Sequence, residues 1–147
     1  MREILKEMEQ AMDVFQIFLI TVGAISLVVG GIGIMNTMYT SVHERTREIG
    51  ILKAVGAKNS TITLIFLIES GVIGLIGGIG GVMGAFLLSK LIEFSTRNSS
   101  IYFLKSTISP SLIIFGLAFS FLIGCLSGFL PARGASKLKP VDALRYE

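Results

Sequence analysis

The side chains that could do chemistry gather in one charged segment of this chain. Residues 42–58, VHERTREIGILKAVGAK, contain His43, the single histidine, among several acids and bases. No second metal ligand or nucleophile accompanies His43 at the spacing that a metal site or a hydrolytic triad requires. The sequence also lacks the glycine-rich Walker A pattern that cradles nucleotide phosphates. We therefore expect no catalytic residue, no metal site and no ATP hydrolysis by this chain itself.

A second candidate is Glu69, the one acid well inside an apolar run. A carboxylate within a membrane span is a functional candidate by default because burying a charge in lipid is costly. Glu69 is close enough to the charged segment to pair with Lys58 or with an arginine of residues 42–58. Three roles stay open for it: a structural ion pair or polar anchor, a part in conformational coupling, or a proton relay.

Composition points to a membrane protein. Hydrophobic residues make up 52% of the chain, and its mean hydropathy is +0.76, which does not suit a soluble domain. Residues 15–39, 62–88 and 110–130 each exceed the ~20 residues that a helix needs to cross a hydrocarbon core of ~30 Å. Basic residues do not alternate with exposed aromatics, so nucleic-acid binding is not expected. The single cysteine, Cys125, excludes an intrachain disulfide.

Residues 42–58 themselves predict a short amphipathic helix. Val42, Ile49 and Leu52 fall on one face at helical spacing. Lys53 stands in the last turn, where a cation meets the negative end of the helix dipole, and Gly56 stands where a left-handed residue would end the helix. A helix that merely lies solvated on the membrane surface is the simple alternative to a binding element.

Glycines recur at regular spacing in the second and third apolar runs. In the second run glycines recur four residues apart in overlapping registers, a pattern that lets membrane helices approach closely. These residues include Gly74, Gly77, Gly78, Gly81 and Gly84. We expect two tightly packed partners, one of them a second copy of this chain; a local bend is the alternative. The third run should begin at Ser109–Pro110 and end at Pro131.

The distribution of basic residues predicts the orientation. Eight of the 13 Lys and Arg residues lie on the side shared by residues 41–60 and 132–147, and an excess of cations marks the cytoplasmic face. The N-terminal segment is then outside the cell membrane without a signal peptide, so we expect the chain to be a fragment of a longer protein.

These expectations give an all-α integral membrane protein. The predicted order is an extracytoplasmic amphipathic stalk helix (1–14), a transmembrane helix (15–40), a cytoplasmic segment with a short helix (41–60), a second transmembrane helix (61–94), an extracytoplasmic loop (95–108), a third transmembrane helix (109–131) and a cytoplasmic tail (132–147).

Three motifs in this order carry a family resemblance. They are ERTREIGILKAVGAK at 44–58, FLIES at 66–70 followed by glycines, and PAR at 131–133 with PVDALRYE at 140–147. Together they resemble the carboxy-terminal half of MacB-like and FtsX-like ABC transporter permeases over essentially the whole chain. Such permeases have four transmembrane helices, an external domain after the first, and a dimeric arrangement with two ATP-binding-cassette subunits or domains. This sequence is similar to helices two to four.

The resemblance implies mechanical transmission from a cytoplasmic ATPase to the stalk. The coupling residues that it implies for ATPase contact are Glu44, Arg45, Thr46, Arg47, Glu48, Ile49, Leu52 and Lys53. ATP and Mg would belong to the partner ATPase, with no cofactor in this chain. The other implied partners are a second permease copy in a homodimer, membrane lipid and a periplasmic or extracellular protein reached through the stalk, for a multi-pass protein of the inner or plasma membrane.

Two other functions stay open. In the FtsX-like branch, the permease moves no substrate and instead regulates an external cell-wall hydrolase. From a different class, the chain could be a self-contained channel or carrier that depends on Glu69.

Overall fold

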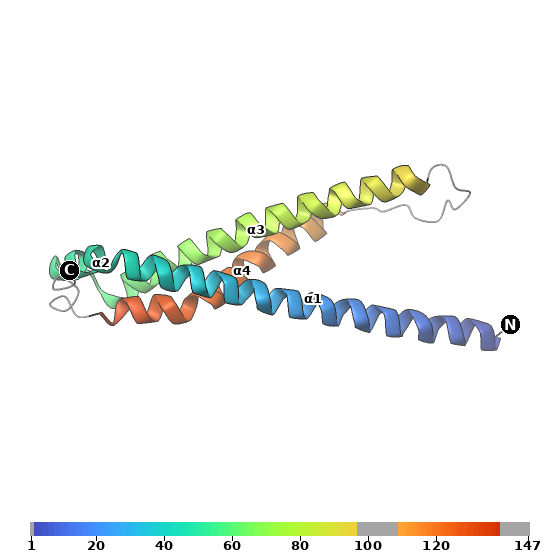
Figure 1. Cartoon of the computed structure of the whole chain (residues 1–147), viewed down its shortest axis with the longest axis horizontal. Helices are drawn as coiled ribbons and strands as arrows, with labels where there is room; N and C mark the ends of the chain where they lie inside the picture. Colours follow the sequence, from blue (N-terminus) through green and yellow to red (C-terminus); the bar gives the residue numbers. More distant parts are fainter. Residues whose placement is uncertain (1, 97–108, 139–147) are drawn as a thin grey trace. The chain divides into compact units, whose positions relative to one another are not determined.

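A computed structural model describes residues 2–96 and 109–138 of the chain (Figure 1). Within them it contains four α-helices and no strand: α1 (Arg2–Glu44), α2 (Thr46–Ala54), α3 (Asn59–Thr96) and α4 (Pro110–Ser136). Three of these helices, α1, α3 and α4, are long and apolar enough to cross a membrane. The predicted all-α membrane fold with three spanning helices is confirmed. The predicted loop (95–108) and the end of the tail lie almost entirely outside the described residues.

The chain divides into two compact units, Met1–Gly33 and Ile34–Glu147. The first unit is one stretch of α1, in which the predicted stalk and first span form a single uninterrupted helix. Hydroxyl groups in this stretch bond to their own helix: Thr21 Oγ1 donates to the Ile17 carbonyl at 2.8 Å, and Ser26 Oγ donates to the Val22 carbonyl at 2.9 Å. Such bonds satisfy polar side chains where an apolar surround offers no partner.

The second unit is built on α3 and α4, which run antiparallel and side by side (Figure 1). With 38 residues, α3 is about 57 Å long at a rise of 1.5 Å per residue. That length exceeds a hydrocarbon core of about 30 Å. Part of α3 therefore extends beyond the apolar layer. Its first turns pack with the charged segment, since Ile62 and Phe66 share a buried cluster with Ile49.

Glycines bring the α3 and α4 backbones into close contact. A Cβ atom added to Gly74 of α3 would lie 2.5 Å from the Ser120 carbonyl oxygen and 2.9 Å from the Gly124 Cα atom of α4. A Cβ atom added to Gly124 would lie 2.5 Å from the Ser70 carbonyl oxygen of α3. These helices could not approach so closely with any larger residue at these positions.

The predicted glycine registers divide into two sets. Gly74 and Gly78 face α4, where a Cβ atom on Gly78 would collide with the Ser120 side chain. A Cβ atom on Gly77, Gly81 or Gly84 would meet no atom of the described residues within 4 Å. One register thus forms the contact between α3 and α4, and the other remains open.

The start of α4 is as predicted, but its end is not. Ser109 is the N-cap residue and Pro110 occupies the first turn. The helix does not stop at Pro131; it continues to Ser136. Proline costs a helix one backbone hydrogen bond, yet Pro131, Ala132 and Ala135 are all buried here. The packing of these three residues offsets the lost backbone hydrogen bond, so α4 continues past Pro131.

All four helices meet in one small core at the α2 end of the second unit. Its buried apolar residues are Met38 of α1, Ile49 of α2, Ile62 and Phe66 of α3, and Ala132 and Ala135 of α4. Figure 1 shows α2 at this end, where α3 begins and α4 finishes. The charged segment therefore rests on packed protein.

Candidate functional site

The candidate site is the exposed side of α2, and a one-residue break separates this helix from α1. Arg45 lies between the two helices with φ −101° and ψ 17°. Thr46 stabilises the break, because its Oγ1 donates to the carbonyls of Val42 at 3.0 Å and His43 at 2.9 Å. Residues 42–44 thus complete α1, and the predicted amphipathic helix is the nine-residue α2.

The end of α2 has the geometry that the sequence predicted. Gly56 has a φ of +100°, in the left-handed region that glycine adopts most readily. The Gly56 amide donates to the Lys53 carbonyl at 3.0 Å, and the Ala57 amide donates to the Leu52 carbonyl at 2.9 Å. This pair of bonds is a Schellman motif, which fixes the direction in which the chain leaves α2.

One side of α2 is buried and the other is not. Ile49 is only 2% exposed and Gly50 is also buried. Leu52, predicted on the same face as Ile49, stays half-exposed, as does Ile51. The exposed polar residues of the segment include Glu44, Arg47 and Glu48, together with His43, Arg45 and Lys58.

An ion pair links the segment to α3. Arg45 Nη1 donates to Glu69 Oε1 at 3.4 Å, and the side chains are 53% and 30% exposed respectively. Arg45 is thus the partner that Glu69 finds among the candidates named from the sequence. A pair this exposed orients the two side chains more than it stabilises the fold.

Lys53 links the segment to α4. Its Nζ donates to the Ser136 carbonyl at 2.6 Å and to the Leu138 carbonyl at 2.7 Å. Sequence reasoning placed Lys53 near the dipole of its own helix and missed this contact. The two carbonyls lie beyond Pro131, where the sequence predicted a tail, so no local signal could have found them.

A shallow hollow of about 80 Å³ lies between α2 and α3. Its walls are Ile49, Leu52, Ile62, Ile65 and Phe66, with Arg45 and Glu48 also lining it.

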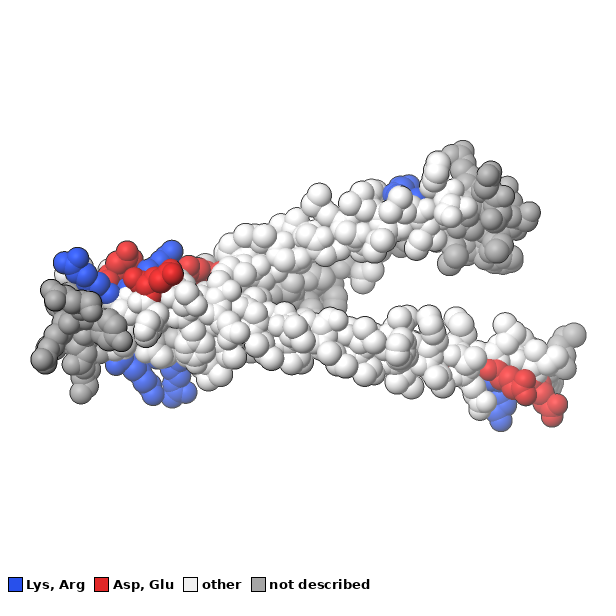
Figure 2. Space-filling model, viewed as in Figure 1, with Lys and Arg blue, Asp and Glu red and all other residues white. Residues whose placement is uncertain are grey.

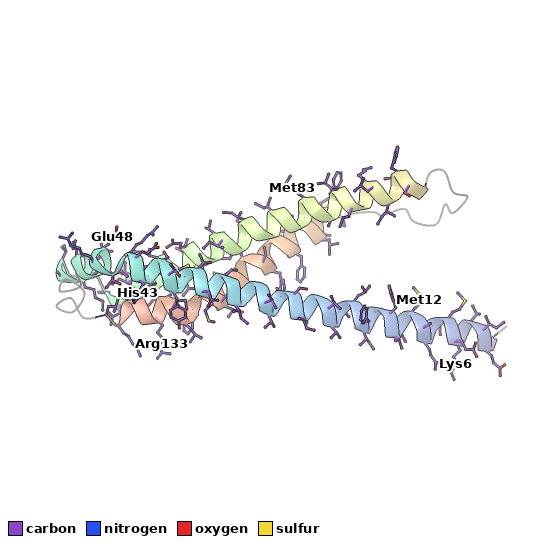
Figure 3. All side chains as sticks on the ribbon, viewed as in Figure 1. Lys6, Met12, His43, Glu48, Met83 and Arg133 are labelled. Atoms are coloured by element: carbon purple, nitrogen blue, oxygen red, sulfur yellow. The ribbon has the colours of Figure 1, made fainter. Side chains whose placement is uncertain are left out.

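Charged side chains gather at this end of the second unit, whereas the visible face of α3 is uncharged over most of its length (Figure 2). Figure 3 shows Glu48 on α2 and Arg133 on α4 at this end, with Met83 farther along α3.

The exposed side of α2 has the composition of a surface for protein contacts. Within residues 2–96 and 109–138, no group of three or more His, Cys, Asp or Glu side chains could hold a metal ion. The surface instead offers both signs of charge beside half-exposed aliphatic side chains, a combination typical of protein contacts.

Comparison with known proteins gives the family. The sequence profile described as FtsX-like permease C-terminal matches residues 20–140. The chain belongs to the FtsX-like permease family. The resemblance found in the three sequence motifs is thereby confirmed.

Similar permeases occur in archaea and bacteria. An uncharacterized ABC transporter permease of Methanocaldococcus jannaschii is 44% identical over 145 residues, which are 99% of this chain and 36% of that protein. The macrolide export ATP-binding/permease protein MacB of Chromobacterium violaceum is 46% identical over 147 residues, which are 100% of this chain and 22% of that protein. The MacB of Bdellovibrio bacteriovorus is 43% identical over 151 residues, again 100% of this chain and 22% of that protein. The chain thus spans between about a fifth and somewhat over a third of these relatives.

Within this FtsX-like permease, the eight predicted coupling residues do not form one surface. Ile49 is buried in the core, Arg45 contacts Glu69, Lys53 contacts the end of α4, and Thr46 bonds to the end of α1. Glu44, Arg47, Glu48 and Leu52 are the members left facing outward. The site therefore has a structural side and an outward side.

Proposed function

We propose that this permease region couples an ATP-binding-cassette ATPase to movement across the membrane, and that α2 is the element on which the ATPase docks. The observation that carries the proposal is the division of α2. Ile49, Arg45 and Lys53 attach it to the other helices of its unit, while Glu44, Arg47 and Glu48 project outward. A helix that is fixed on one side and charged on the other can receive a force without detaching.

The relatives support an ATPase partner. The proteins named MacB carry "ATP-binding/permease" in their names, and this chain matches only part of each. In our proposal the partner binds ATP and Mg and hydrolyses the nucleotide, and the chain described here contributes no catalytic group. Arg47 would pair with a carboxylate of the ATPase through the two parallel hydrogen bonds that a guanidinium favours.

The orientation and the dimer are part of the same proposal. The side that carries α2 and the C-terminus is cytoplasmic, which the excess of basic residues there supports. The N-terminal part of α1 leads to an extracytoplasmic partner. The open register of Gly77, Gly81 and Gly84 on α3 accommodates a second copy of the permease, as small residues favour in membrane interfaces.

The test is co-purification of the full-length permease with a candidate ABC ATPase from the same organism. We expect Arg47→Glu to lower recovery of the ATPase at least about tenfold, because a hydrogen bond to a charged group contributes about 1.5–3 kcal/mol and 1.4 kcal/mol corresponds to tenfold in affinity. The control is Lys90→Glu, which reverses the charge of an exposed residue near the C-terminal end of α3, far along the helix from α2. Undiminished recovery with Arg47→Glu would contradict docking through α2.

Regulation of an external cell-wall hydrolase is a variant of this proposal with a different output. It needs the same ATPase contact and differs in what the stalk moves. Reconstitution of the full complex with a candidate hydrolase, with hydrolase activity measured with and without ATP, distinguishes the two.

A further inference from the structure

We infer that Lys53 is the positioning residue through which a displacement of α2 reaches α4. The inference rests on the proposed function, since it concerns the route that a force on α2 would take. Its basis is a pair of hydrogen bonds that join parts of the chain 83 and 85 residues apart, at 2.6 and 2.7 Å.

The C-terminal turn of α4 needs these bonds. The last four carbonyls of a helix have no partner within it. In α4, the Arg133 carbonyl accepts from Ser136 Oγ at 2.9 Å, and the carbonyls of Gly134 and Ala135 accept from the amides of Lys137 and Leu138 at 3.1 and 3.3 Å. Among the described residues, Lys53 of α2 is the donor to the Ser136 carbonyl, at 2.6 Å. The cation also lies at the negative end of the α4 dipole, where a positive charge is stabilising.

The apolar core reinforces the same contact. Ile49 and Lys53 are four residues apart and therefore share one face of α2. Ile49 belongs to the buried cluster that contains Ala132 and Ala135 of α4, so the hydrophobic and the polar contacts of α2 reach the same two turns. Consequently, α2 cannot move away from α4 without breaking both.

The link to α3 is the weaker of the two. The Arg45–Glu69 contact is a single one at 3.4 Å between partly exposed side chains, a class of ion pair that adds little stability. Lys53 makes two shorter bonds at a partly buried position. Of these two polar links, the one to α4 is therefore the firmer, and α4 in turn contacts α3 where Gly124 meets Gly74.

The experiment begins with the full-length permease alone in lipid nanodiscs. Spin labels on cysteines at Val55, the C-cap residue of α2, and Arg133 of α4, both exposed, report their separation by EPR in a Cys125→Ser background. We expect a narrow distance distribution in the unsubstituted protein, at least a twofold broadening with Lys53→Met, and recovery with Lys53→Arg, which keeps the charge and the donors. Lys58→Met, a change of an exposed lysine just after α2, is the matched control and should leave the distribution unchanged. An unchanged distribution with Lys53→Met would overturn the inference.

A second arm uses the complex with the ATPase and a spin label at Ser111, in the first turn of α4. ATP should change the mobility of this label, and Lys53→Met should reduce the change at least fivefold while ATPase recovery stays within twofold. Full retention of the change with Lys53→Met would also overturn the inference. If the ATPase fails to co-purify even with the unsubstituted permease, the proposed docking function is wrong, and the EPR distances without ATPase still decide the role of Lys53.

Discussion

The Arg45 guanidinium lies 3.4 Å from the Glu69 carboxylate and joins the start of α2 to α3. Both side chains are partly exposed, at 53% and 30%, so we predict a coupling energy below about 1 kcal/mol. Arg45→Gln, Glu69→Gln and the double variant form the cycle that measures it, by thermal unfolding of the full-length protein in nanodiscs. A coupling energy above about 2 kcal/mol would show that the pair is more strongly desolvated than its geometry indicates.

The same pair bears on the carrier alternative. The Glu69 carboxylate is paired with Arg45, in the half of α3 that lies nearer to α2. It is therefore suited to orient α2. We predict that liposomes containing the permease alone show no proton flux that Glu69→Gln removes, measured with an entrapped pH-sensitive dye. A flux that is present in the unsubstituted protein and lost in this variant would favour the carrier over the ATPase-coupled function.

Ile49 holds α2 on the core, and its truncation should destabilise the protein. Because its side chain is only 2% exposed, we predict that Ile49→Ala lowers the free energy of unfolding by about 2–5 kcal/mol. The matched control is Ile51→Ala, two residues on and 48% exposed, with an expected change within about 0.5 kcal/mol. Denaturant titration in detergent micelles provides both values, and equal losses would contradict the burial pattern of α2.

The two glycine registers of α3 should respond differently to a methyl group. Gly74→Ala would place a Cβ atom 2.5 Å from the Ser120 carbonyl, so we expect a loss of about 1–3 kcal/mol from overpacking. Gly77→Ala meets nothing within 4 Å and gains up to about 1 kcal/mol of helix propensity. Thermal unfolding separates the two effects. If Gly77→Ala weakens self-association in light scattering without lowering stability, the dimer proposal gains support.

Gly56 should resist substitution because of its backbone. At a φ of +100°, a side chain costs about 1–2 kcal/mol, although no atom would collide with it. We predict this loss for Gly56→Ala and none for Gly134→Ala, a glycine within α4 that also has open space around it. Comparison of the two unfolding midpoints is the measurement, and an unchanged midpoint for Gly56→Ala would argue against the Schellman motif at the end of α2.

Local signals predicted much of this fold. The lengths of the apolar runs identified three spanning helices, because the bilayer imposes a minimum length that needs no knowledge of packing. Ser109–Pro110 marked the start of α4 and Gly56 marked the end of α2, since each depends on the backbone preference of one or two residues. The family resemblance also came from local sequence, because three short motifs occur in the expected order.

Other features depend on contacts distant in sequence and could not be predicted. The helix-breaking preference of Pro131 is overridden by the burial of Ala132 and Ala135. The choice between the Gly74 and Gly77 registers depends on how α4 meets α3. The role of Lys53 depends on carbonyls more than 80 residues away. In the candidate site, the sequence could not separate the anchoring residues of the segment 42–58 from its outward ones.

The two-sided character of α2 has a consequence for how such permeases diversify. The residues that hold the helix in place and those that face outward are different residues, so the outward set can change with little cost to folding. Under the docking proposed above, exchange of Glu44, Arg47 and Glu48 for other polar side chains would change which ATPase is recognised, while Ile49 and Lys53 keep α2 attached to the other helices. The same proposal implies that a few surface substitutions would let such a permease bind a different ATPase while its membrane helices stay unchanged.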